Sequence, residues 1–120
     1  MEIYHLTRVS DWKAAQENGT YRISSNNLSL ERAGYIHASL PHQLPAVAEL
    51  VFAGVTDPLC VLVMDSDGIE ATGTPVRWED GGSGELYPHI YGPIHPTWVT
   101  DVIAAGFDES SGAFQVYPDR

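Results

Sequence analysis

Three of the five histidines in this chain lie in short segments whose residues favour β-strands: His5, His37 and His89. Imidazole donates and accepts hydrogen bonds and changes charge near neutral pH, so it suits contacts to phosphate or ribose and transfer of a proton. Alternate residues of a strand face opposite sides, so each histidine faces either the core or a cleft. Any one of them alone can be structural. Together they favour a histidine-lined cleft, and we predict that the three share one sheet and converge on one concave surface. Removal of His89 from such a cleft should have little effect on stability.

The segment Pro-His-Ile-Tyr-Gly-Pro at residues 88–93 concentrates residues that restrict or free the backbone around a histidine and a tyrosine. Proline fixes one backbone angle and glycine permits unusual ones, as a rigid loop that presents polar groups requires. We therefore predict that His89, Tyr91 and Gly92 face a ligand. The alternative is a bent edge strand that ends in a turn.

Glu79 precedes a glycine-rich loop at residues 81–84 and is a candidate acid or base. The loop lacks the lysine and following helix of a P-loop, so hairpin flexibility explains it better than phosphate binding. No metal site is expected, because the histidines show no short ligand spacing and Cys60, the only cysteine, reads as a buried, inert thiol. Asp-Ser-Asp-Gly at residues 65–68 resembles the start of a calcium loop, but Thr74 stands where that pattern needs glutamate, so we predict a turn.

The composition indicates one globular domain over residues 1–120, with 43% hydrophobic and 18% charged residues. Sixteen acidic residues against six basic ones give a formal net charge of −10, which disfavours nucleic acid and anionic membranes as partners. The longest apolar run, residues 59–64, is too short to span a bilayer, and the N-terminus lacks the pattern of a secretion signal. We expect a cytoplasmic protein without a nucleic-acid or membrane partner, and its oligomeric state is left open.

Strand propensity and apolar periodicity predict an α+β domain with a mixed β-sheet and a few short helices. The run at residues 59–64 is continuously apolar, which predicts a central strand buried on both faces. Apolar residues recur at helical period across residues 44–52. The other predicted elements are a helix at residues 10–18 and strands at 3–7, 20–23, 35–39, 76–79, 87–91 and 113–117, with residues 98–107 ambiguous.

Several motifs occur in an order that resembles a known family. They are Ile-Tyr-His at residues 3–5, Gly-Thr-Tyr at 19–21, Gly-Tyr-Ile-His-Ala-Ser at 34–39, Val-Arg-Trp-Glu at 76–79 and Pro-His-Ile-Tyr-Gly-Pro at 88–93. Over about residues 3–105 the chain resembles the bacterial and plant family catalogued as domain of unknown function 952. The resemblance implies a fold similar to the ADP-ribosyltransferases, in which a split, mixed β-sheet surrounds a nucleotide cleft.

That resemblance implies a nucleotide such as NAD, or an ADP-ribose-type ligand, as the bound small molecule, and a transferase as the activity. It assigns roles to the candidate residues: a ribose contact for His5, a phosphate or base contact for His37 and Ser39, the reacting centre for His89 and Tyr91, and an acid or base role for Glu79. Two alternatives stay open. One is a catalytically inactive module that binds a small molecule or a protein segment, and the other is an interaction domain whose histidines only pair within the sheet.

Overall fold

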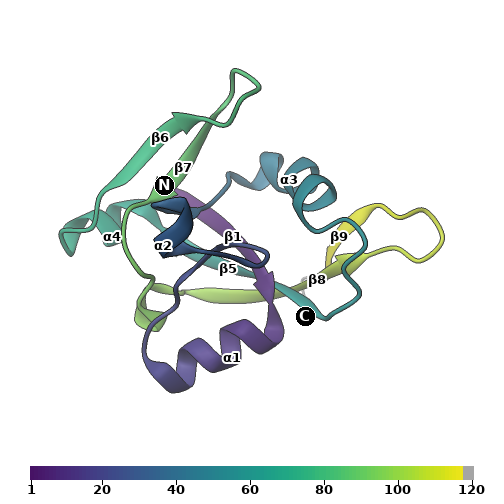
Figure 1. The fold of residues 1–120 in the computed structure, drawn as a ribbon, viewed down its shortest axis with the longest axis horizontal. Helices are drawn as coiled ribbons and strands as arrows, with labels where there is room; N and C mark the ends of the chain where they lie inside the picture. Colours follow the sequence, from purple (N-terminus) through teal and green to yellow (C-terminus); the bar gives the residue numbers. More distant parts are fainter. Residues whose placement is uncertain (118–120) are drawn as a thin grey trace.

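The strand β5 (Leu59–Asp65) lies at the centre of a four-stranded sheet, and its apolar run is buried on both faces as predicted. Successive side chains of a strand point to opposite faces, so the run supplies two hydrophobic clusters. They receive Cys60, Leu62 and Met64 on one side and Leu59, Val61 and Val63 on the other. The computed structural model describes residues 1–117, and its ribbon is drawn in Figure 1.

The described strands form two sheets and a ribbon instead of a single sheet. The larger sheet has the order β1 (Glu2–Arg8), β5, β8 (Asp101–Phe107) and β9 (Phe114–Tyr117), the smaller sheet has the order β4 (Ile36–His37), β7 (Leu86–Ile90) and β6 (Val76–Asp80), and β2 (Ile23–Ser25) pairs with β3 (Leu28–Ser29). Every one of these pairs is antiparallel, so the prediction of a mixed sheet is wrong. Parallel neighbours need a crossover connection, and each α-helix here joins strands that belong to different sheets.

Within residues 1–117 the α-helices are α1 (Val9–Asn18), α2 (Leu30–Ala33), α3 (Leu44–Val51) and α4 (Ser66–Ala71), with 3-10 turns at Pro41–Gln43 and Pro96–Trp98. The start of α4 occupies the place where we predicted a turn. Asp65 accepts a hydrogen bond from the backbone N–H of Asp67 at 3.3 Å, and this cap favours a helix over an isolated turn. None of the described helices is long and apolar enough to cross a membrane.

The helices α1 and α3 cover opposite faces of the larger sheet (Figure 1). Trp12 of α1 packs into the first cluster, and Leu44 and Ala48 of α3 pack into the second. At a short apolar residue such as Ala48 the helix approaches the sheet closely, and its opposite face, which includes Glu49 and Leu50, is exposed to solvent. The fold is thus an α+β arrangement of antiparallel sheets and short helices.

The two sheets meet where β1 runs beside the segment that follows β4. Tyr4 and Ser39 exchange two backbone hydrogen bonds, each 2.8 Å long. The neighbours of these two residues are therefore brought together, and they include His5 on β1 and His37 on β4. This junction positions the candidate site.

Candidate functional site

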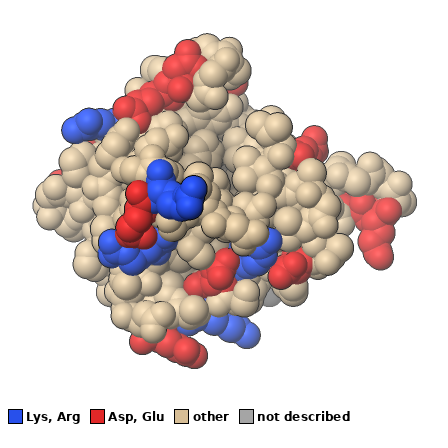
Figure 2. Space-filling view, in the orientation of Figure 1, with Lys and Arg blue, Asp and Glu red and all other residues tan. Residues whose placement is uncertain are grey.

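A cleft of about 230 Å³ lies between α3, the β2–β3 ribbon and the face of the smaller sheet. Figure 2 shows a hollow in the surface between the β6–β7 hairpin and α3. The sheet supplies aromatic and imidazole rings to this cleft, whereas α3 and the ribbon supply apolar and hydroxyl groups. The rings belong to Tyr35, His37, Tyr87 and His89.

The backbone register explains why these rings share one face. His37 of β4 is paired with His89 of β7, and Tyr87 precedes His89 by two residues, so its side chain points to the same side. Tyr35 stands two residues before His37 in the same way. The Tyr-x-His spacing occurs in both segments. This spacing is the sequence signal for Tyr35 and Tyr87, which were not among the predicted site residues.

Two contacts fix the ring of His89, which is only 3% exposed. Its Nδ1–H donates a hydrogen bond to Oε1 of Glu79 at 2.8 Å. The ring of Tyr35 stacks on it with centroids 3.9 Å apart and an angle of 13° between the planes. The second ring nitrogen, Nε2, makes no hydrogen bond to any other residue of the described chain. His89 therefore has a defined tautomer and one free nitrogen at the cleft.

Glu79 is held as a carboxylate by two donors. Besides His89, the hydroxyl of Tyr91 donates to the same Oε1 at 2.6 Å. The hydrogen bond from Tyr91, followed by that from His89, lowers the pKa of Glu79, and the carboxylate in turn raises the pKa of Tyr91. Arg77 lies over the ring of Tyr91, with its guanidinium carbon 4.7 Å from the centroid. Glu79 is thus an ionised partner for His89 at neutral pH.

Tyr91 and Gly92 do not belong to the lining of the cleft. The Tyr91 hydroxyl is used by Glu79, so its described contact is with the carboxylate. At Gly92 a Cβ atom would come within 3.2 Å of the Cγ2 of Thr74, which gives this glycine a packing role. Both residues therefore make their contacts outside the lining of the cleft, directly after the end of β7.

His37 stands beside His89 with its ring centroid 5.6 Å away, and 5.4 Å from that of Tyr87. Burial, with a smaller contribution from His89, lowers the pKa of His37 to about 4. Its ring is therefore neutral at physiological pH. The hydroxyl of Ser39 lies 3.5 Å from Nε2 of His37, a long contact that leaves Ser39 buried beneath the ring.

His5 lies under the cleft, is 2% exposed, and both of its ring nitrogens are occupied. Nδ1–H donates to the backbone carbonyl of His37 at 2.6 Å, and Nε2 lies 2.7 Å from the hydroxyl of Tyr21. Burial lowers the pKa of His5 to about 4, so Nε2 is an acceptor and Tyr21 donates to it. The Tyr21 hydroxyl also lies 2.7 Å from Oγ1 of Thr7.

The expectation that the three histidines share one sheet is therefore wrong. His5 is on β1 of the larger sheet, and His37 and His89 are on the smaller one. The three are close in space because the Tyr4–Ser39 junction joins the sheets.

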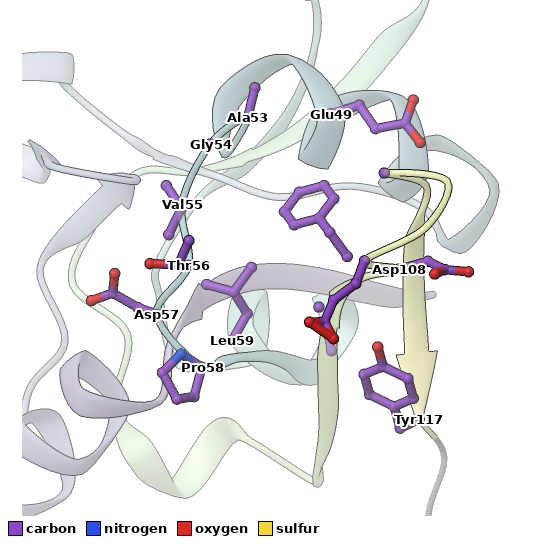
Figure 3. Close-up of a pocket in the computed structure, with 15 residues that line it drawn as sticks. Glu49, Ala53, Gly54, Val55, Thr56, Asp57, Pro58, Leu59, Asp108 and Tyr117 are labelled. Atoms are coloured by element: carbon purple, nitrogen blue, oxygen red, sulfur yellow. The ribbon is translucent and has the colours of Figure 1, made fainter.

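A larger cavity of about 660 Å³ lies elsewhere, between the loop that follows α3 and the β8–β9 hairpin (Figure 3). Three of the four carboxylates in its described lining have partners. Glu49 accepts from the N–H of Phe114 at 3.3 Å, Asp57 pairs with Arg8 at 3.4 Å, and Asp108 accepts from the N–H of Ser110 at 2.8 Å. No histidine is among its described lining residues. The smaller cleft carries the reactive groups, and we take it as the candidate site.

Nothing in the described residues forms a group of three or more histidine, cysteine and carboxylate side chains suited to a metal ion. Cys60 is buried in the core, and burial raises the pKa of its thiol to about 11. The thiol is therefore not ionised at neutral pH. The reactive groups of the cleft are imidazole, phenol and hydroxyl.

The fold and the motifs that build this cleft define a family. The family described as "Protein of unknown function (DUF952)" matches residues 6–102, and the chain belongs to it. The crystal structure of protein CC0527 from Caulobacter crescentus is similar, with 26% identity and a TM-score of 0.80 over 96% of this chain and 94% of that one. The solution NMR structure of CC0527 gives a TM-score of 0.73 over 93% and 90% of the two chains. No curated protein matches the sequence.

Proposed function

We propose that this protein binds a nucleotide-type ligand, of the NAD or ADP-ribose kind, in the cleft, and that His89 exchanges a proton with a hydroxyl of that ligand. The observation that carries the proposal is the 2.8 Å hydrogen bond from His89 Nδ1 to Glu79, combined with a free Nε2. A carboxylate on one nitrogen of an imidazole selects the tautomer whose other nitrogen is a base. It also stabilises the imidazolium that forms when the base takes a proton.

The other groups of the cleft support a ligand that combines a flat ring and a sugar. Tyr35 and Tyr87 offer aromatic faces, and Val47 and Val51 of α3 form an apolar wall. Ser24 and Ser25 bring two hydroxyls to the same space. When His89 takes the proton of a ribose hydroxyl, that oxygen can attack C1 of the nicotinamide ribose of NAD, where the glycosidic bond breaks and nicotinamide leaves, so a transferase is the reaction that we favour. As part of this proposal, and by analogy, we take the fold to be similar to that of the ADP-ribosyltransferases.

A catalytically inactive binding module is the second candidate, and one observation favours it. His5 has both nitrogens occupied, and burial lowers the pKa of His37 to about 4, so its ring is a weak base. His89 is then the one imidazole available for proton transfer in the described cleft. A reaction that needs a separate acid and base would have to recruit the second group from the ligand.

Binding and turnover measured on one pair of proteins separate these candidates. In His89→Asn the amide nitrogen takes the place of Nδ1 and keeps the bond to Glu79, whereas Nε2 is lost. Calorimetric titration with NAD, ADP-ribose, nicotinamide riboside and adenosine measures binding, and chromatography of NAD mixed with each of the other three measures nicotinamide release and product. We expect saturable binding by the wild-type protein and a loss of product formation of about 100-fold or more in His89→Asn.

Saturable binding without product in the wild-type protein would favour the inactive module. Absence of binding for all four compounds would contradict both candidates. A similar product yield from wild type and His89→Asn would remove His89 from the reaction.

A further inference from the structure

The charge and size of the cleft narrow the ligand class, and this inference rests on the proposed function. We infer that the cleft holds the nucleoside part of its ligand, a planar ring joined to a ribose, and that any phosphate group stays outside the cleft. A phosphate-bearing ligand would place its charge outside the cleft or bind more weakly than its nucleoside. Three features of the described residues support this.

The cleft offers no cation to a phosphate. Neither lysine nor arginine is among its described lining residues. Arg77 belongs to the same sheet, but its guanidinium lies over the ring of Tyr91, outside the lining. Figure 2 shows acidic side chains along the edge of the β6–β7 hairpin that is turned away from α3. This hairpin carries Glu79, Asp80 and Glu85. A buried anion without a paired cation is costly, and nearby carboxylates repel it.

The glycine loop next to the cleft is not available as a phosphate cradle either. Gly81 lines the cleft, and backbone N–H groups of such a loop are the usual donors to phosphate. Here the N–H groups of Gly82 and Gly84 donate to Oδ1 of Asp80, at 2.7 and 3.0 Å. These hydrogen bonds lower the pKa of Asp80, so its carboxylate stays ionised at neutral pH. The site of a possible anion is occupied by the protein's own carboxylate.

The cleft is also small, and its lining includes uncharged polar groups. Its volume of about 230 Å³ lies below the roughly 300–1,000 Å³ common for drug-sized ligands, and a dinucleotide is larger still. Ser24 is 2% exposed, lines the cleft, and its hydroxyl is used in no side-chain hydrogen bond within residues 1–117. Ribose hydroxyls both donate and accept, so they match serine hydroxyls and the free Nε2 of His89.

Matched pairs of ligands that differ by one phosphate test this inference. Calorimetric titrations with adenosine against AMP, and with nicotinamide riboside against nicotinamide mononucleotide, are compared at 20 and 300 mM NaCl. We expect the better-bound nucleoside to bind at least about fivefold more tightly than its monophosphate at 20 mM NaCl. The ratio should shrink at 300 mM NaCl, because salt screens the repulsion between phosphate and carboxylates.

A second variant isolates the glycine loop. Asp80→Ala releases the two amide groups and removes one negative charge, so we expect the affinity for AMP to rise at least threefold while adenosine binding stays the same. Asp67→Ala, which removes an exposed carboxylate on α4, is the matched control and should change neither. Tighter binding of the monophosphates by the wild-type protein, weakening with salt, would overturn the inference and leave the proposed function standing. Absence of binding for every nucleoside and nucleotide would overturn both.

Discussion

At the scale of single residues, the site depends on the contacts that orient His89. The sequence suggested a solvated histidine that could be removed without loss of stability. In the structure its ring is 3% exposed, stacked on Tyr35 and bonded to Glu79. A ring in such a place contributes both to the site and to the packing beneath it, so its removal should lower stability.

His89→Ala should lower the free energy of unfolding by about 2 kcal/mol, because it removes a stacked ring and a charge-assisted hydrogen bond. His89→Asn keeps the bond to Glu79 and should lose about half as much. Urea unfolding followed by circular dichroism measures both. A change below about 0.5 kcal/mol in His89→Ala would show that the ring is more exposed than described here.

The buried histidines predict how stability depends on pH. The pKa values of His5 and His37 fall from 6.5 to about 4 on folding, so between these pH values the unfolded chain binds protons that the folded chain does not. Stability is therefore lost as pH falls from about 6.5 toward 4. From pH 7.5 to 5.0 each histidine should remove roughly 2 kcal/mol from the free energy of unfolding.

Replacing one of these histidines tests that explanation. His5→Asn retains a donor toward the carbonyl of His37 but does not titrate, so it should remove about half of the pH dependence between pH 7.5 and 5.0. Urea unfolding at several pH values gives the slope. An unchanged slope in His5→Asn would mean that other groups cause the acid sensitivity.

The structure places His37 and His89 in the lining of the cleft, and His5 and Tyr91 outside that lining. Glu79 and His89 lie on neighbouring strands of one hairpin, and their separate sequence features were enough to select both. His5 has the same strand context as His37, and only the packing of β1 against Tyr21 distinguishes a buried ring from one at the cleft. That difference arises between elements far apart in the chain, so no local pattern could predict it.

At the scale of elements, β5 is an interior strand of the larger sheet and supplies side chains to both hydrophobic clusters. Leu62 is 0% exposed within the first hydrophobic cluster, so Leu62→Ala should lower the free energy of unfolding by about 2–5 kcal/mol. Its partner across the sheet, Val102, is 41% exposed and provides a matched control. Val102→Ala should cost less than about 1 kcal/mol. Equal losses in the two variants, measured by urea unfolding, would argue against a central position for β5.

The turn between β2 and β3 connects the ribbon to α3 across the cleft. Asn26 has a positive φ of 49°, and its side-chain amide donates to the backbone carbonyl of Val51 at 3.0 Å. Asn26→Ala loses the hydrogen bond and strains the backbone, so it should lower the free energy of unfolding by about 1–2 kcal/mol. Asn26→Gly loses only the bond and should cost less. Thermal unfolding of both variants tests this order, and greater destabilisation by glycine would contradict it.

The strong patterns predicted their elements, and the weak ones did not. The apolar run of β5 was visible in the sequence because both faces of that strand are buried. The helical period of α3 was visible because one stripe of that helix is buried. The helix α4 was missed, because its first residues, Asp-Ser-Asp-Gly, are also turn residues and its cap forms only with the chain in place. The division into two sheets was missed because it depends on pairing between distant strands.

At the scale of the whole molecule, the net charge of −10 includes carboxylates on the β6–β7 hairpin, whereas the described lining of the cleft holds no carboxylate, lysine or arginine. The charge still predicts that nucleic acid is an unfavourable partner. It also gives the cleft its preference for an uncharged ligand. The arrangement of two sheets places that cleft on the smaller sheet, while the larger one supplies most of the core.

The central claim is that His89 carries its proton on Nδ1 and presents Nε2 to a ligand in the cleft. Long-range ¹H–¹⁵N NMR spectra at pH 8 report the protonation of each imidazole nitrogen, and titration with adenosine or nicotinamide riboside reports which nitrogen the ligand reaches. We predict a protonated Nδ1 and a bare Nε2 in His89, with Nε2 shifted by the ligand. The exposed His42 and His95 should remain unchanged as internal controls. A proton on Nε2 of His89, or a ligand that shifts His42 or His95 and leaves His89 unaffected, would contradict the account.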